Sequence, residues 1–183
     1  GCTIILGICL PVMLLTALAV KVTSPGPIIF AQKRLTQGGR IFWIYKFRTM
    51  RSDAEKSSGA VWATVGDSRV TPIGRFLRLV RLDELPQLIN VLIGDMSLVG
   101  PRPERPELVA QIEEKLPDFR KRLAVKAGLT GLAQIEAGYA SDLDEYDKKL
   151  ALDLKYIENR SIWLDISLLF RTVSVIVFRK GSR

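Results

Sequence analysis

Two adjacent carboxylates, Asp83 and Glu84, lie between apolar residues in the segment 78–88. The chain contains no histidine, which excludes a Ser-His-Asp triad and any zinc site with a histidine ligand. Its two cysteines cannot supply a four-thiolate zinc site. Acid-base or nucleophilic chemistry therefore falls to carboxylates or to Lys, Tyr, Ser, Thr or Cys. A bare Asp-Glu pair is more commonly a solvated or arginine-paired surface, so its neighbours decide which role is expected.

Several cations accompany this pair. Arginines recur every third residue just before it, and the proline-containing loop 94–103 presents another arginine shortly after it. The cations available to the pair are Lys46, Arg48, Arg78, Arg81 and Arg102. Carboxylates that approach a phosphate need cations or a metal ion to offset the repulsion. The combination predicts phosphoryl transfer, with a carboxylate as nucleophile or as metal ligand.

The elements that must position these residues are predicted to be short and of both kinds. Apolar and aromatic residues over 28–32 and 40–47 predict two strands, and Thr36-Gln37-Gly38-Gly39 between them predicts a hairpin loop. Thr71 and Pro72 predict the start of a helix that runs to about Leu82. Pro86 interrupts it, and a second helical stretch is expected as far as about Ile93.

The rest of the chain is predicted to be mainly helical. The expected elements are a helix over 104–123 with a break near Pro117, a turn followed by a short strand over 128–134, and an acidic helix over 141–159. Neither internal repeats nor a low-complexity linker is visible. We therefore expect an α+β fold in which residues 23–183 form one catalytic domain.

The N-terminal segment is built for a membrane. Residues 2–20 carry no charge, and 19 residues of helix match a hydrocarbon core of roughly 30 Å. The segment lacks the basic start of a cleavable signal peptide. Pro11 at its centre predicts a kinked spanning helix or a re-entrant helix that returns to the same face, with residues 1–22 as this unit. The basic residues that follow place the catalytic domain in the cytoplasm, and Cys2 and Cys9 are expected to be buried thiols without a disulfide.

The C-terminal segment 161–178 is also strongly apolar, with Asp165 and Arg171 as its only charges before a basic tail at 179–183. This pattern predicts an interfacial helix that lies on the bilayer, with Trp163 at the level of the headgroups. A helix buried in the protein core is the alternative.

The chain is basic, with 27 Lys and Arg against 19 Asp and Glu and a formal net charge of +8. Its basic blocks border the N-terminal apolar segment and both flanks of the acidic block 83–119. This distribution suits anionic lipid headgroups and a phosphorylated substrate. Nucleic acid is not expected as a partner, because no nucleic-acid motif is visible and aromatic residues are not interleaved with the basic ones.

Four ordered motifs resemble those of the bacterial sugar transferases, the monotopic polyprenyl-phosphate phosphoglycosyl transferases that begin the assembly of capsules, exopolysaccharides and O-antigens. The motifs are Tyr45-Lys46-Phe47-Arg48-Thr49-Met50, Arg78 with Leu82-Asp83-Glu84-Leu85-Pro86-Gln87, Gly94-Asp95-Met96-Ser97-Leu98-Val99-Gly100-Pro101-Arg102-Pro103, and Gly128-Leu129-Thr130-Gly131-Leu132-Ala133-Gln134. The resemblance covers essentially the whole chain. One departure is Leu10 before Pro11, where some members carry a small polar residue.

The resemblance implies a two-step reaction. Asp83 would attack the β-phosphate of a UDP-sugar, release UMP and hold the sugar phosphate covalently, and a polyprenyl phosphate would then take it. Glu84 would orient the site or manage protons, and Mg²⁺ bound in part by Asp83 would neutralise diphosphate charge. Lys46, Arg78 and Arg102 would bind phosphate. The turn that contains Gly131 and Gln134 would help to hold the nucleotide.

Other implications concern location and partners. We assign Arg48 to the substrate-binding residues. For both Arg48 and Arg81, an internal ion pair or a contact with lipid headgroups is an equal alternative. The resemblance implies a re-entrant N-terminal helix broken at Pro11, several short amphipathic helices at the membrane interface, the bacterial inner membrane as location, and a catalytic domain on its cytoplasmic face. A homo-oligomer is compatible with this interpretation. Two further hypotheses are a membrane-bound metal-dependent phosphohydrolase and a non-catalytic basic membrane adaptor.

Overall fold

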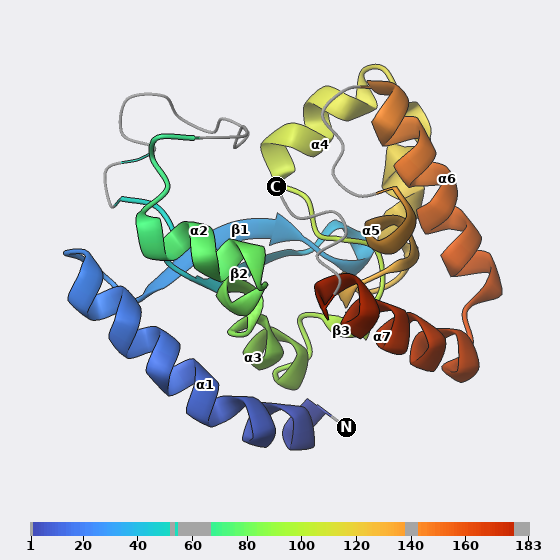
Figure 1. The fold of residues 1–183 in the computed structure, drawn as a ribbon. Coiled ribbons are helices and arrows are strands. Elements are labelled where there is room, and N and C mark those ends of the chain that lie inside the picture. Colours follow the sequence, from blue (N-terminus) through green and yellow to red (C-terminus); the bar gives the residue numbers. More distant parts are fainter. Residues whose placement is uncertain (1, 52–53, 55–66, 138–142, 178–183) are drawn as a thin grey trace.

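The protein has an α+β fold in which short helices surround two small sheets (Figure 1). A computed structural model describes residues 2–51, 54, 67–137 and 143–177. The basic tail at 179–183 and most of the loop between residues 51 and 70 lie outside this part. The predicted fold class is confirmed.

The N-terminal helix α1 runs from Cys2 to Thr23 and contains Pro11 on an exposed surface. It meets the length and hydropathy of a membrane-crossing helix, and 17% of its most apolar window is buried. Figure 1 shows the helix changing direction part-way along its length, although the helical assignment is continuous. Both cysteines are free thiols and are half-buried.

Both ends of α1 contact the rest of the protein. At the N-terminal end, the Cys2 thiol donates a hydrogen bond to the Leu88 carbonyl (3.5 Å). Toward the C-terminal end, Val20 is fully buried in a cluster with Phe47 and Leu77. The helix therefore lies along the rest of the protein rather than projecting away from it.

The predicted hairpin is confirmed. Strands β1 (Ile29–Leu35) and β2 (Ile41–Phe47) are antiparallel, with Ile29 opposite Phe47 and Leu35 opposite Ile41. The short 3₁₀ turn η1 (Gln37–Gly39) joins them, and its two glycines adopt positive φ angles of 69° and 78°. Residues 33–35 extend the first strand beyond its predicted end, because their backbone pairs with residues 41–43.

Helix α2 (Pro72–Leu79) begins as predicted, with the Thr71 side chain accepting a hydrogen bond from the Gly74 amide. It ends three residues before the predicted Leu82. Arg81 adopts a left-handed conformation (φ 59°, ψ 16°) that an α-helix cannot contain, and a 3₁₀ turn η2 (Leu82–Glu84) follows. Helix α3 (Gln87–Leu92) then begins directly after Pro86.

A parallel pair of strands was not predicted. Strand β3 (Ser97–Val99) lies within the segment expected as a loop, and it pairs with β4 (Gly128–Thr130). The prediction of a turn followed by a strand over 128–134 is wrong, since the strand comes first and helix α5 (Leu132–Glu136) follows it. Three-residue strands that pair across 30 residues leave no periodicity for local reasoning to detect.

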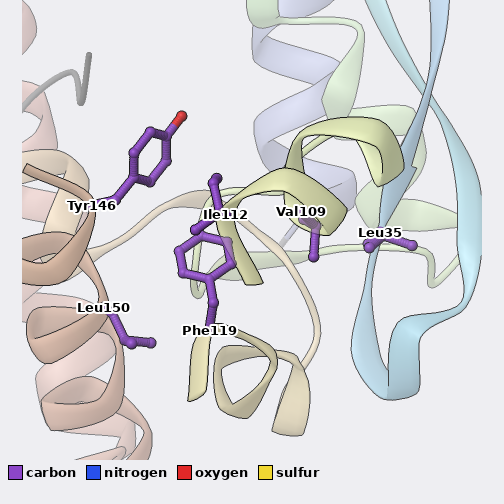
Figure 2. Close-up of a cluster of buried hydrophobic side chains, with 6 residues drawn as sticks. All are labelled: Leu35, Val109, Ile112, Phe119, Tyr146 and Leu150. Atoms are coloured by element: carbon purple, nitrogen blue, oxygen red, sulfur yellow. The ribbon is translucent and has the colours of Figure 1, made fainter. Parts of the chain in front are cut away.

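The remaining helices form the opposite end of the molecule. They are α4 (Pro106–Glu113), the 3₁₀ segment η3 (Pro117–Ala124), α6 (Leu143–Asn159) and α7 (Ile162–Val177). The break near Pro117 is confirmed. Figure 2 shows a buried cluster in which Phe119 lies between α4 and α6, and Leu35 of β1 closes it. The cluster joins the hairpin to the C-terminal half.

Helix α7 divides into two faces. Leu168 is fully buried and packs with Val99 and Tyr156, whereas Trp163 is 80% exposed. The exposed apolar residues recur at helical spacing along one stripe: Ile162, Trp163, Ile166, Phe170 and Val173. The core-helix alternative therefore applies to one face only, and the other face is apolar without protein cover in the described residues.

Candidate active site

The dyad sits in η2, the turn that the left-handed Arg81 creates between α2 and α3. Asp83 and Glu84 are 6% and 9% exposed, so both carboxylates are buried. The flanking residues Leu82 and Leu85 pack against the cluster of Val20, Phe47 and Leu77. This packing fixes the turn against strand β2 and helix α1.

Glu84 is held by two of the predicted cations. Lys46 Nζ of β2 lies 2.8 Å from Glu84 Oε1, and Arg102 Nη2 lies 2.5 Å from the same oxygen. Burial alone would raise the pKa of Glu84, but the charges of Arg102 and Lys46 hold it well below its ordinary value. Glu84 is therefore an anion whose charge is already satisfied.

Asp83 has a different environment. Its Oδ1 atom is buried and has no hydrogen-bond partner. Burial and the neighbouring Glu84 charge raise the pKa of Asp83 to about 6, and the charges of Lys46, Arg78 and Arg102 oppose that rise. The three cations thus act on Asp83, and the structure brings Lys46, Arg78, Arg102, Asp83 and Glu84 together as predicted from the sequence.

Thr49 connects Arg78 to the strand that carries Lys46. The Arg78 Nε atom donates to Thr49 Oγ1 (2.9 Å). The Thr49 carbonyl accepts from the Thr71 amide (2.9 Å), and Gly74 of α2 packs so closely on it that an added Cβ would lie 2.1 Å from the oxygen. Thr49 is the residue after Arg48 in the first motif, but nothing in its sequence context distinguishes it from a surface threonine.

Arg48 does not join this cluster. Its guanidinium is buried and donates to the carbonyls of Val20, Ser24 and Pro25 and to the Ser24 hydroxyl. The C-terminal carbonyls of a helix lack partners within the helix, and a cation stabilises that end. Arg48 is therefore engaged by the end of α1, and its assignment to substrate binding stays a prediction. Arg48 caps α1, which is neither the ion pair nor the lipid contact considered as alternatives.

Gly131 directly follows strand β4, and Gln134 lies in helix α5. A Cβ at Gly131 would lie 2.2 Å from the Gly100 carbonyl, so this glycine permits α5 to approach the loop before Arg102. Gln134 Nε2 donates to the Leu129 carbonyl (3.1 Å), while its Oε1 is buried without a partner. In the described part of the chain, neither residue forms a hydrogen bond with the dyad. Their nucleotide-binding role stays a prediction.

Asn90 is a positioning residue that sequence reasoning missed. Its fully buried side chain accepts from the Tyr45 amide (3.0 Å) and donates to the Trp43 carbonyl (2.7 Å), fastening α3 to β2 next to Lys46. An asparagine inside the apolar run Leu88-Ile89-Asn90-Val91-Leu92 was the available signal, since a buried amide requires partners.

The carboxylates of the site can supply few metal ligands. Within the described residues there is no group of three or more His, Cys, Asp or Glu side chains suited to a metal ion. Mg²⁺, however, commonly takes one or two carboxylates and completes its shell with water and substrate phosphates. The Asp83 carboxylate fits that sparse donor set, because Glu84 is already paired with Lys46 and Arg102.

Comparison with known protein families identifies the family of this chain. Residues 1–179 match the family model described as bacterial sugar transferase. The chain belongs to the bacterial sugar transferase family. The match includes α1 as well as every element that carries the dyad and its cations.

Similar bacterial sugar transferases have names that specify a reaction. The chain is 46% identical over 173 residues to UDP-N-acetylgalactosamine-undecaprenyl-phosphate N-acetylgalactosaminephosphotransferase of Aeromonas hydrophila. It is 44% identical over 173 residues to UDP-glucose:undecaprenyl-phosphate glucose-1-phosphate transferase of Escherichia coli K12, and 44% over 165 residues to the transferase of the same name from Caulobacter vibrioides. These matches cover 94%, 93% and 89% of the chain, but 41%, 37% and 61% of the respective relatives. The chain therefore spans less than two thirds of the length of each of these relatives.

Proposed function

We propose that this bacterial sugar transferase chain moves a sugar 1-phosphate from a UDP-sugar to undecaprenyl phosphate through a covalent intermediate on Asp83. The names of the relatives support the donor and the acceptor. The observation that carries the proposal is the contrast within the dyad: Glu84 is ion-paired to two cations, whereas Asp83 has a buried oxygen with no partner.

In the first step, Asp83 Oδ1 attacks the β-phosphorus of the UDP-sugar. A new bond forms between this oxygen and the phosphorus, the bond to the bridging oxygen of the diphosphate breaks, and UMP leaves with that electron pair. A carboxylate free of hydrogen bonds is a better nucleophile than one already engaged with donors. Asp83 suits this role and Glu84 does not.

In the second step, an oxygen of undecaprenyl phosphate attacks the same phosphorus. The bond to Asp83 breaks, the carboxylate is regenerated, and undecaprenyl diphosphate sugar is the product. The two substrates can use one cationic site in turn, so a water-soluble donor and a lipid acceptor need not be bound together. Release of UMP before the lipid reacts is the kinetic signature of this order.

Lys46 and Arg102 have two functions in this proposal. They keep Glu84 charged, and they place positive charge beside the position that a diphosphate occupies when Asp83 attacks it. The charge of Arg78, from α2, also acts on the Asp83 carboxylate. Mg²⁺ would be held by Asp83 together with the diphosphate oxygens, and it would supply additional charge neutralisation.

The arrangement of α1 supports a re-entrant membrane helix. Because Cys2 contacts α3 and Val20 packs beneath β2, both ends of the helix lie on the same protein body. A helix that crosses the bilayer would carry one end away from that body. We place the chain at the bacterial inner membrane, with the catalytic domain on its cytoplasmic face and the apolar stripe of α7 in the interface.

Intact-protein mass spectrometry tests the chemistry. The chain is incubated with Mg²⁺ and either UDP-glucose or UDP-N-acetylgalactosamine in the absence of lipid acceptor, and the adduct and the released UMP are measured. We expect a sugar-phosphate adduct and release of no more than one UMP per chain. Asp83→Asn should form no adduct, because the amide retains the size of the side chain and removes its nucleophilicity.

Glu84→Gln separates the two carboxylates. It should lower turnover by about 10²-fold, because the neutral amide no longer holds Lys46 and Arg102 in place, while still forming some adduct. Peptide mapping that places the adduct on Glu84 would overturn the assignment of Asp83. Sustained UMP release without lipid would indicate a phosphohydrolase instead.

A further inference from the structure

The loop that carries Arg102 is held at five consecutive residues, 100–104. Three of the contacts are backbone hydrogen bonds to strands: the Gly100 amide donates to the Thr130 carbonyl (2.9 Å), the Gly128 amide to the Pro101 carbonyl (2.9 Å) and the Leu35 amide to the Glu104 carbonyl (3.0 Å). Pro101 and Pro103 have no amide proton, so this loop cannot form a ladder of its own. Its position depends on donors from elsewhere.

The two remaining residues, Arg102 and Pro103, are held by arginine side chains instead. Arg34 Nη1 donates to the Pro103 carbonyl (3.2 Å), and Arg122 Nη2 donates to the Arg102 carbonyl (2.9 Å). Arg122 therefore bonds directly to the backbone of the residue whose guanidinium pairs with Glu84.

Arg122 is itself fixed by Asp153 of α6. Arg122 Nε donates to Asp153 Oδ2 (2.8 Å), its Nη2 lies 2.6 Å from the same oxygen, and both side chains are 2% exposed. The guanidinium also lies over the Phe119 ring, 4.8 Å from its centroid. The planar group thus links α6, the aromatic cluster and the Arg102 carbonyl in one fixed orientation.

A buried ion pair contributes little net stability to a protein core. Removing two charges from water is unfavourable, and apolar residues of similar volume commonly give equal or greater stability. What apolar residues cannot supply is a donor to the Arg102 carbonyl. The feature that requires a guanidinium at this position is therefore the geometry of the loop.

We propose that Arg122 and Asp153 are positioning residues that hold Arg102 against Glu84. Among the described residues, Arg122 and Asp153 form no hydrogen bond or ion pair with the dyad, and Arg122 acts through the Arg102 backbone. This role rests on the proposed function, because the accuracy that it provides matters only where Arg102 must meet a reacting phosphate. A displacement of about 1 Å can cost 10²-fold in rate.

Arg122→Lys is the principal variant. Lysine keeps the positive charge beside Asp153 but lacks the planar fork that reaches both Asp153 and the Arg102 carbonyl. We expect turnover to fall by about 10- to 100-fold, the range seen when a group supporting a reactive residue is lost. Lys121→Ala is the matched control, since Lys121 is the preceding residue of η3 and pairs with Asp118 at the surface. It should turn over at the wild-type rate.

A double-mutant cycle distinguishes positioning from general stability. If Arg122 acts through Arg102, then Arg122→Lys should add less than about twofold to the loss caused by Arg102→Ala. Multiplying losses would overturn the proposal. Where Arg122→Lys does not fold, Asp153→Asn replaces it in the same cycle, because asparagine has the same size and can still accept one hydrogen bond.

Hydrogen exchange gives a readout that does not depend on turnover. The amides of Leu35, Gly100 and Gly128 are protected by, or belong to, the Arg102 loop. In Arg122→Lys they should exchange faster than in the wild type, while the amide of Tyr45, bonded to Asn90, keeps its wild-type rate. Unchanged exchange at the three loop amides, or faster exchange at all four, would overturn the positioning role even if UDP-sugars prove not to be substrates.

Discussion

At the scale of single residues, the dyad shows how neighbouring side chains of the same chemistry acquire different properties. Glu84 faces Lys46 and Arg102, and its pKa is held low by them, whereas burial raises the pKa of Asp83 to about 6. The difference comes from the 3₁₀ turn, which directs adjacent residues to different partners. Asp83 thereby retains a carboxylate oxygen that no protein donor occupies.

Arg81 makes this turn possible and is the one described non-glycine residue with a positive φ. A left-handed residue with a Cβ costs roughly 1–2 kcal/mol, and a β-branched side chain costs more. We predict that Arg81→Gly preserves the turn and that Arg81→Val unfolds at a lower temperature and loses turnover. Both variants lack the guanidinium, so its loss does not contribute to the difference between them.

Thermal unfolding in detergent micelles measures the change in stability. UMP release from the UDP-sugar, measured on folded protein below the unfolding temperature, measures turnover. Equal unfolding temperatures for the glycine and valine variants would show that the left-handed conformation is not needed to form η2.

Sequence reasoning identified most residues of the site but not their pairing. Lys46, Arg78 and Arg102 were found because phosphate chemistry requires cations near the carboxylates, and the structure brings them there. The contacts of Arg48 could not be predicted, because a basic residue in a motif has the same appearance whether it meets a substrate or the carbonyls at the end of a helix. That distinction depends on where Val20 and Ser24 lie after folding.

At the scale of elements, close contacts between backbones set the distances within the site. The α2–β2 contact is an example: Gly74 lies against Thr49, whose hydroxyl holds Arg78. We predict that Gly74→Ala destabilises the protein by about 1–3 kcal/mol, the usual cost of overpacking, and lowers turnover. The added methyl group must separate α2 from Thr49, which moves Arg78.

Gly7→Ala in α1 is the control for Gly74→Ala, because a Cβ there meets no atom within 4 Å and alanine favours a helix. Denaturant unfolding of both variants measures the difference. Unchanged stability and turnover for Gly74→Ala would mean that α2 can shift without moving Arg78.

The apolar stripe of α7 gives a second prediction at this scale. In a Trp43→Phe, Trp62→Phe background, fluorescence reports Trp163 alone. We expect its emission in vesicles to be blue-shifted and quenched by lipids brominated close to the headgroup, because an aromatic ring at the interface is partly removed from water. Emission typical of water, without quenching, would place α7 away from the bilayer.

Elements with a local pattern were predictable, and elements formed by distant contacts were not. The hairpin and the starts of α2 and α7 follow from turn residues, caps and hydrophobic pattern in their own segments. The pair β3–β4 has no such pattern, because its three-residue strands are defined by each other. The end of α2 was also missed, since Leu82 continues an apolar pattern that only the conformation of Arg81 interrupts.

At the scale of the whole molecule, buried charges join the two halves of the chain. Glu104 accepts from Lys149 of α6 and lies 3.6 Å from Arg34 of β1. Burial opposes the shift, but the charges of Lys149, Arg122 and Arg34 lower the pKa of Glu104 to about 2. A carboxyl whose pKa is lowered on folding stabilises the protein above its unfolded pKa, and that stabilisation is lost as the pH falls.

We therefore predict that wild-type stability declines between about pH 5 and pH 2, with a contribution from Glu104 of about 3 kcal/mol. Glu104→Gln should be less stable than the wild type at pH 7, and the difference should shrink as the pH approaches 2. Denaturant unfolding across this pH range measures both curves. Parallel curves would show that the pKa of Glu104 is the same in the folded and unfolded states.

The same network has a consequence for the order of events during translation. Arg102 leaves the ribosome before Lys149 and Asp153 of α6, by an interval on the order of several seconds for the stretch from Arg102 to Asp153. Throughout that interval α1 and the dyad have been synthesised, but the Arg102 loop lacks its supports. The nascent chain can thus bind a membrane before its catalytic centre is complete. The supports of the Arg102 loop become available only when α6 has emerged.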